Sequence, residues 1–205
     1  MDTRKTKDLL YEHVARIGKA TSSPKRLELL EILAQGEKTV EALAVDASLS
    51  VKLASAHLKV LKEARLVEAR REGRNIAYRL SGPDVSALWV NLRIVAEEHL
   101  VELKLAMDGL FTAPEKLDGE TRRSLMDKAR RGDVVVIDVR PAAEYENGHL
   151  PFARSMPVAE LRQRLKELPA DKEIVAYCRG PFCMMSAKAV TLLQEHGYRA
   201  RKIAD

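Results

Sequence analysis

Hydrophobic residues recur at helical spacing in the first 64 residues of the chain and predict four helices. The second helix begins at Ser23-Pro24, and Thr39 is suited to cap the short third helix. A turn at Ser48-Leu49-Ser50 separates the third helix from a longer fourth helix over residues 51–64. A short helix, a tight turn and a longer helix in this order predict a helix-turn-helix unit.

Two short strands and a long helix are expected next. Residues 66–70 and 76–80 flank a turn at Gly73 and predict a two-stranded wing. Gly82-Pro83-Asp84 then opens a helix that we expect to run to about Leu110. Its apolar stripe is wider than the core of one small domain needs, so we expect a homodimer interface there; the stripe holds Val85, Leu88, Leu92, Val95, Leu100 and Leu103.

The hydrophobic pattern changes after residue 112. Residues 113–119 contain proline, glycine and charged residues and predict a linker. Beyond it, β-branched runs at 134–137 and 174–177 alternate with helical segments at 120–131, 158–168 and 185–196. We therefore expect two domains: a mainly α winged helix-turn-helix domain over 1–112, and an α/β domain with a parallel sheet over 120–205.

Composition and charge bear on whether the protein enters a membrane, where it is located and what it binds. Hydrophobic residues make up 46% and charged residues 32% of the 205, and no apolar run approaches the ~18 residues of a membrane helix. The charged N-terminus lacks the apolar core of a secretory signal, which predicts a cytoplasmic protein without a membrane partner. The net charge of +5 is compatible with a nucleic-acid partner but is shared by both halves, so a DNA partner has to be argued from motifs.

The fourth helix has an apolar face and a basic face. Val51, Ala54, Leu58 and Leu61 are expected to pack on the preceding helices. The opposite face is expected to meet the major groove of double-stranded DNA; it carries Lys52, Ser55, Lys59 and Lys62, with His57 beside them. Wing arginines would hold phosphates alongside; they are Arg70, Arg71, Arg74 and Arg79. The alternative is an ordinary solvated lysine face.

Residues 23–80 resemble the ArsR family of winged-helix repressors. The resemblance rests on Leu58-Lys59-Val60-Leu61-Lys62-Glu63-Ala64-Arg65-Leu66-Val67 and on Gly73-Arg74 followed by Tyr78-Arg79-Leu80. It implies a homodimer that joins through its first and last helices and represses promoters until an inducer binds. Metal-sensing members carry cysteines in the third helix or Asp and His ligands on the last helix. Here the third helix begins Val40-Glu41-Ala42-Leu43 and the last offers only Asp84 and His99, so we expect no metal at these positions.

Two cysteines lie five positions apart, at the ends of the six-residue segment Cys178 to Cys183, which follows the second buried strand and precedes a helix. Backbone N–H groups of such a loop, together with the helix N-terminus, favour a thiolate over a thiol. Gly180 allows backbone conformations in the loop that other residues disfavour, and Arg179 is expected to add positive charge near the sulfur. The alternative is an inert cysteine in the core.

Residues 117–205 resemble the rhodanese family. The matching motifs are Ile137-Asp138-Val139-Arg140, Gly148-His149-Leu150-Pro151 and Tyr177-Cys178-Arg179-Gly180. The resemblance implies a persulfide carried on Cys178, and ion pairing of Asp138 with Arg140 is expected to brace the loop. Rhodanese domains continue with a Gly, a Trp and a closing helix beyond the position of Ala204-Asp205, so we expect this domain to lack that helix and to turn over poorly.

Two questions concern this cysteine loop: the role of Cys183, and whether the domain is a phosphatase. Cys183 either resolves a persulfide or sulfenate on Cys178 into a bridge or packs beneath the loop. Dual-specificity phosphatases place an arginine six positions after their cysteine, where this chain has Met184, so a phosphatase is disfavoured.

Three functions follow from these observations. The first is a homodimeric repressor that responds to sulfane sulfur or oxidants through Cys178, with small sulfur species as inducers. The second is a rhodanese-type sulfurtransferase whose DNA-binding domain is autoregulatory. The third is a metal-responsive repressor with Cys178 and Cys183 as ligands, although two thiolates are few for a closed site. No cofactor is expected.

Overall fold

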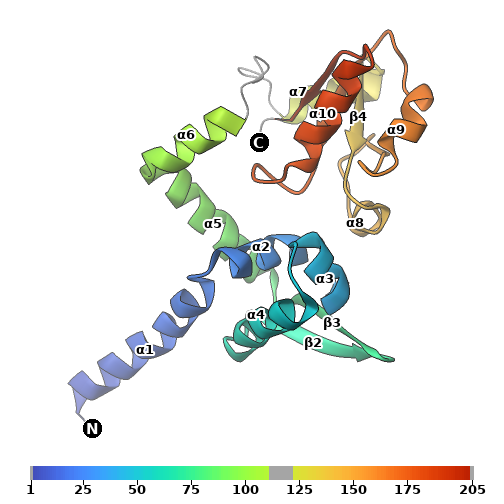
Figure 1. The fold of residues 1–205 in the computed structure, drawn as a ribbon. Coiled ribbons are helices and arrows are strands. Elements are labelled where there is room, and N and C mark those ends of the chain that lie inside the picture. The colour runs from blue at the N-terminus through green and yellow to red at the C-terminus, as the bar shows by residue number, and fades with distance from the viewer. Residues whose placement is uncertain (1, 111–121, 204–205) are drawn as a thin grey trace. The chain divides into compact units, whose positions relative to one another are not determined.

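The computed structural model describes residues 2–110 and 122–203, which fall into two compact units, Met1–Leu103 and Lys104–Asp205. The expected linker at 113–119 lies outside the described residues. The first unit is a helical winged helix-turn-helix, and the second contains a parallel sheet with helices, as the sequence predicts (Figure 1).

Helices dominate the first unit. The sequence of helices is α1 (Thr3–Thr21), α2 (Pro24–Leu33), α3 (Val40–Asp46), α4 (Val51–Glu63) and α5 (Pro83–His99). The Thr39 and Ser50 hydroxyls accept hydrogen bonds from backbone N–H groups in the first turns of α3 and α4, so both helices of the predicted helix-turn-helix begin at side-chain caps. Their apolar faces meet in one core that includes Leu29, Leu43 and Leu58.

The wing consists of β2 (Val67–Glu72) and β3 (Asn75–Leu80), paired antiparallel from Val67 opposite Leu80 to Glu72 opposite Asn75. Gly73 has a φ of +61° and so allows the two-residue turn at the tip. A short strand that the sequence analysis did not predict, β1 (Lys38–Thr39), pairs with β3 and completes the three-stranded sheet.

The prediction of a single helix from Asp84 to about Leu110 is wrong in one respect. It is divided into α5 and α6 (Val101–Leu110) by Leu100, whose φ of −101° and ψ of 102° are extended. One residue with extended dihedral angles is enough to end a helix, and neither glycine nor proline marks this position in the sequence.

The second unit is a four-stranded parallel sheet in the order β5-β4-β6-β7. Its strands are β4 (Val134–Asp138), β5 (Arg154–Ser155), β6 (Glu173–Tyr177) and β7 (Ala200–Lys202). The two edge strands are only two and three residues long, and the sequence analysis did not predict them.

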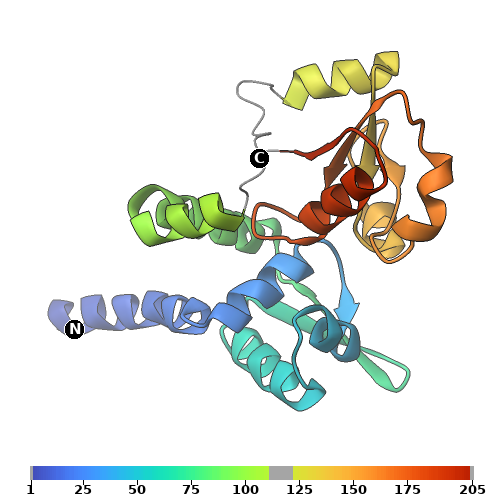
Figure 2. The same ribbon diagram turned by 45° about the horizontal axis from the view of Figure 1, so that its top comes forward.

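Helices cover both faces of this sheet. On one face, α9 (Leu161–Arg164) and α10 (Met185–Glu195) pack on Val135 and Ile137 of β4, and α10 is seen in red against the sheet in Figure 2. On the other face, α7 (Arg122–Arg131) packs on Val134 and Val136, and α8 (Ala142–Asn147) follows β4. Alternate β4 residues thus serve opposite cores, which is why this strand is a continuous apolar run.

The helix predicted over residues 158–168 is shorter than expected. Only Leu161–Arg164 is α-helical, and Leu165–Glu167 tightens into a 3-10 turn. Leu161, Leu165 and Leu168 are all buried, so the apolar spacing was interpreted correctly while the helix type was not.

Candidate functional site

Cys178 directly follows β6, at the carboxyl end of a central strand, in the loop that leads to α10. The loop contains a turn in which the N–H of Cys183 donates to the carbonyl of Gly180 over 3.0 Å. The carboxyl end of a central parallel strand, next to a helix N-terminus, is a common position for a reactive group in α/β folds.

The Cys178 sulfur has polar neighbours on several sides. Its Sγ lies 3.2 Å from the hydroxyl oxygen of Ser186 and 3.3 Å from the carbonyl oxygen of Cys183. Backbone N–H groups of Ser186 and Gly180 also contribute hydrogen bonds to the sulfur. The Cys183 carbonyl can only accept from a protonated thiol, whereas the Ser186 hydroxyl and the N–H groups of Ser186 and Gly180 favour a sulfur anion.

The two thiols share one proton unequally. The Cys183 thiol donates a hydrogen bond to the Cys178 sulfur, and this bond, with the donors from Ser186 and Gly180, lowers the pKa of Cys178 from its ordinary value of 9.0 to about 6 against the opposing effect of burial. The same bond raises the pKa of Cys183, and burial raises it further. The fold thus favours the thiolate at Cys178 and the thiol at Cys183.

Arg179 does not supply the positive charge that the sequence analysis expected beside the sulfur. Its guanidinium forms a buried two-bond pair with Glu144 of α8, with Nε to Oε2 at 3.0 Å and Nη2 to Oε1 at 2.5 Å. Glu144 is 1% exposed, and its negative charge balances that of the arginine. The pair instead ties the start of the Cys178 loop to α8.

Asp138 and Arg140 form the ion pair that the sequence analysis expected. The Arg140 Nη2 lies 2.6 Å from Asp138 Oδ2, and the Arg140 backbone N–H also donates to this carboxylate. A further bond of 2.7 Å from Arg140 to the carbonyl of Gly148 joins the end of β4 to the segment after α8. Both side chains are buried, so the pair fixes the carboxyl end of the strand next to β6.

Tyr177 makes a second set of contacts that hold the carboxyl end of the sheet in place. Its hydroxyl accepts a hydrogen bond from the Leu150 N–H over 3.0 Å, and burial raises its pKa. The Arg140 guanidinium lies 5.7 Å from the centre of its ring. Hence the residue before Cys178 is fixed by side-chain contacts as well as by the strand.

In the first unit, α4 presents a hollow of about 730 Å³ on its outer side. All four predicted lysine and serine positions line it, together with Tyr78 of the wing; the full set is Val51, Lys52, Ser55, Ala56, Lys59, Lys62 and Tyr78. The structure therefore brings the basic stripe and the wing to one concave surface.

One residue of α4 does not lie where the sequence placed it. Val51 was expected to pack on the preceding helices, yet it is 48% exposed and lines the hollow, because it is the first residue of the helix and only Ala54, Leu58 and Leu61 reach the core. His57 is half-buried and is not among the residues that line the hollow.

The four wing arginines differ in their partners. Arg70 pairs with Glu37 at 2.5 Å, which raises its pKa, and Arg79 pairs with Glu68 at 2.7 Å. Arg71 donates to the Gly73 carbonyl, and within residues 2–110 and 122–203 the side chain of Arg74 makes no ion pair. Arg74 at the wing tip is accordingly the most available cation of the four.

Sequence reasoning missed Glu144 and Ser186 as site residues. No local pattern could pair Glu144 with Arg179, because the two residues lie 35 positions apart. Ser186 could have been found, because a hydroxyl in the first turn of a helix that follows a cysteine loop is positioned to donate toward the sulfur.

In the part of the chain that the structure describes, no helix is long and apolar enough to span a membrane. The same residues contain no group of three or more His, Cys, Asp or Glu side chains arranged to hold a metal ion.

Comparison with known proteins gives matches in both halves. Residues 23–69 match the model of the bacterial regulatory protein, arsR family, and residues 121–204 match that of the rhodanese-like domain. The HTH-type transcriptional regulator Rv0324 of Mycobacterium tuberculosis is 43% identical over 199 residues, 97% of this chain and 87% of that protein.

Two further proteins each match one half. A sulfurtransferase of Allochromatium vinosum is 35% identical over 66 residues, which are 32% of this chain and 60% of that protein. The solution structure of a homodimeric winged helix-turn-helix DNA-binding domain, Mb0332 of Mycobacterium bovis, is 45% identical and covers 50% of this chain and 92% of that one, with a TM-score of 0.45.

Proposed function

The chain belongs to the ArsR family of bacterial transcriptional regulators and carries a rhodanese-like domain, and from this premise we propose that it is a homodimeric repressor whose DNA affinity responds to sulfane sulfur or oxidants at Cys178. The observation that carries the proposal is the position of Cys178 in the loop between β6 and α10, where its Sγ lies 3.2 Å from the Ser186 hydroxyl and hydrogen bonds lower its pKa to about 6. A cytoplasmic location follows from the proposed DNA partner.

The sulfur step needs only the two cysteines and the inducer. The Cys178 thiolate attacks the terminal sulfur of an inorganic polysulfide; a new S–S bond forms to Cys178, the adjacent S–S bond of the polysulfide breaks, and the shortened polysulfide leaves with the electron pair. The protein then carries a persulfide anion, which the same N–H and hydroxyl donors stabilise in place of the thiolate.

Cys183 provides a second step. Its sulfur attacks the Cys178 sulfur of the persulfide, the outer sulfur leaves as hydrosulfide with the proton of the Cys183 thiol, and a Cys178–Cys183 disulfide remains. The two thiols are oxidised and the sulfane sulfur is reduced to sulfide. The contact between the two sulfurs supports this resolving role by position, and the raised pKa of Cys183 means that its thiol must pass its proton to the leaving sulfur as it attacks.

DNA binding is proposed at the hollow on α4. Lys52, Lys59 and Lys62 supply charge for phosphates or guanine edges, and Ser55 supplies a hydroxyl from the same face. Arg71 and Arg74 at the wing tip would reach the adjacent backbone.

The homodimer is proposed on the apolar surfaces of α1 and α5. Leu10 and Val14 on α1 are 62% and 69% exposed, and Leu88, Leu92 and Val95 on α5 are also exposed. Surface apolar side chains on two helices of one unit, repeated at helical spacing, are typical of a face that a partner covers.

The test is DNA binding by fluorescence anisotropy with and without inorganic polysulfide, at fixed salt, on a fragment selected by the protein from a random DNA library. We expect polysulfide to change the affinity of the wild type at least tenfold and to leave Cys178→Ser unchanged. Cys183→Ser serves as the matched control, because it retains the persulfide step and loses only the bridge.

Equal responses of wild type and Cys178→Ser would overturn the sensor. A sulfurtransferase would show sustained turnover from thiosulfate to cyanide together with DNA affinity indifferent to polysulfide. Because we propose a sensor and not an enzyme, we expect fewer than a few turnovers per chain in the thiosulfate-to-cyanide assay.

A further inference from the structure

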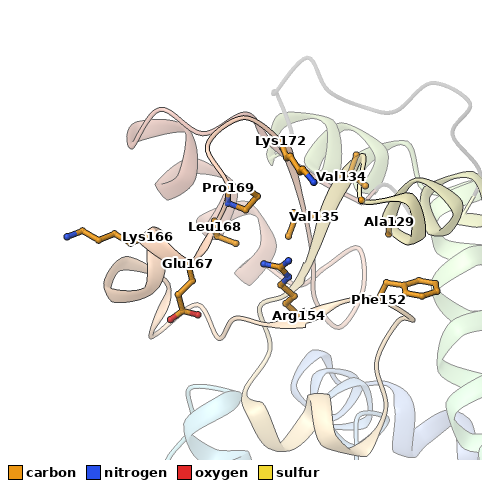
Figure 3. A pocket seen from close by; sticks show the side chains of 11 residues that line it. Ala129, Val134, Val135, Phe152, Arg154, Lys166, Glu167, Leu168, Pro169 and Lys172 are labelled. Carbon is orange, nitrogen blue, oxygen red and sulfur yellow. The ribbon is translucent and has the colours of Figure 1, made fainter.

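The second unit contains a cavity of about 410 Å³ at the end of the sheet opposite the Cys178 loop (Figure 3). It lies at the amino ends of β4 and β6, between the end of α7, the start of β5 and the connection from Lys166 to Lys172. Six residues separate Lys172 from Cys178 along β6, or about 20 Å at ~3.3 Å per residue. The volume is within the usual range of small-ligand sites, ~300–1,000 Å³.

The cavity has a mixed lining, in which apolar side chains lie beside charged ones. Apolar residues of α7, of β4 and of the segments before β5 and β6 contribute to this lining; they are Ala129, Val134, Val135, Phe152, Leu168 and Pro169. Figure 3 shows the Arg154 guanidinium and the Lys172 amine pointing toward the cavity, whereas Lys166 points away from it. The two cations come from different segments and approach the same space.

These cations are not neutralised by the fold. Neither the Arg154 nor the Lys172 side chain forms an ion pair or hydrogen bond with any other residue in the ranges 2–110 and 122–203. Glu167 is the one acidic residue in the lining, and both of its oxygens are held by Arg164, at 2.9 and 2.8 Å. The neighbouring Asp133 pairs with Arg131 at 2.8 Å.

We propose that this cavity binds a small organic anion, a carboxylate or phosphate ester, with its charge between Arg154 and Lys172 and its apolar part against Val135 and Leu168. A guanidinium and an amine complement an anionic head, and the apolar wall favours a ligand with a hydrocarbon body over a bare ion. The site is separate from the sulfur chemistry at Cys178 and does not depend on it.

The experiment is a titration of the ¹⁵N-labelled full chain with phenyl phosphate, followed by backbone amide shifts in NMR. We expect saturable shifts at Gly132, Val135 and Lys172, with inorganic phosphate binding at least tenfold more weakly. Arg154→Gln and Lys172→Gln should each weaken phenyl phosphate about tenfold, while Lys166→Gln should change affinity less than twofold.

Binding at the Cys178 loop is the competing explanation, and Cys178→Ser resolves it. The proposal holds if this variant binds phenyl phosphate as the wild type does. It is overturned if the saturable shifts lie at Gly180 and Cys183, if no shift saturates, or if Arg154→Gln and Lys172→Gln bind as the wild type does. Equal affinity for inorganic and phenyl phosphate would overturn the assignment of an organic ligand.

Discussion

The two units of this protein use charge in opposite settings. On the wing of the first unit, the ion pair of Arg79 with Glu68 lies on the surface, with side chains 64% and 52% exposed, whereas the pairs Lys38–Asp46 and Arg93–Glu97 elsewhere in that unit are largely buried. In the second unit, Asp138, Arg140, Glu144 and Arg179 form two buried pairs around the cysteine loop. Surface charge can meet a large external polyanion, whereas buried charge holds a reactive group in place.

This difference has an energetic counterpart. An exposed pair contributes little because water screens both partners, and either can leave to contact DNA. A buried pair is costly to break, since removal of one partner leaves an uncompensated charge in a medium of low dielectric constant. The contrast can be tested by substitutions in each unit.

The largest effect is expected from Asp138→Asn, which keeps the shape of the side chain but leaves Arg140 without its counter-charge. We expect a loss of about 3–5 kcal/mol in the unfolding free energy of the second unit. Urea unfolding followed by circular dichroism measures it, while fluorescence of Trp89, the single tryptophan, reports on the first unit and should not shift. Glu68→Gln is the surface control, and a similar loss there would contradict the contrast.

The next effect concerns the thiolate. Cys183→Ala removes the largest cause of the lowered pKa of Cys178, so the pH dependence of iodoacetamide modification of Cys178 should move up from about 6 by at least one unit, ~1.4 kcal/mol. Ser186→Ala should shift it less, and Cys183→Ser, which keeps a hydroxyl donor, should remain close to the wild type. An unchanged profile in Cys183→Ala would refute the shared proton.

The same pKa predicts how stability depends on pH. Because folding lowers the pKa of Cys178 from 9.0 to about 6, its contribution is complete above about pH 9 and is lost as the pH falls through 6. The stability difference between wild type and Cys178→Ala should therefore shrink from pH 9 to pH 6 in urea unfolding. A difference that stays constant across this window would show that the thiolate is not favoured by the fold.

The smallest effect is expected on the wing. Arg74→Ala should weaken DNA binding a few-fold and reduce the slope of log affinity against log salt by about 1, because one phosphate contact is lost. Arg70→Ala is the matched control and should change less, since Arg70 is already paired with Glu37. Anisotropy titrations at several salt concentrations measure both, and a larger effect of Arg70→Ala would reverse the ranking.

Local patterns determined much of this protein in advance. Apolar spacing in α4 and α10, the caps at Thr39 and Ser50 and the β-branched runs of β4 and β6 each depend on neighbours a few residues apart, so the sequence alone was sufficient to predict the two folds. The position of Cys178 at a strand end was predictable for the same reason.

Only the tertiary structure decided the partners of the charged residues. Arg179 could not be assigned to Glu144, nor Arg70 to Glu37, because these residues are 35 and 33 positions apart and meet only when the strands pair and the loops close. The short strands β1, β5 and β7 were missed because two or three residues carry no periodicity and are strands only through hydrogen bonds to their neighbours. Side-chain type and the local loop thus determined that Cys178 favours the thiolate, and long-range packing decided that Arg179 is a structural ion-pair partner.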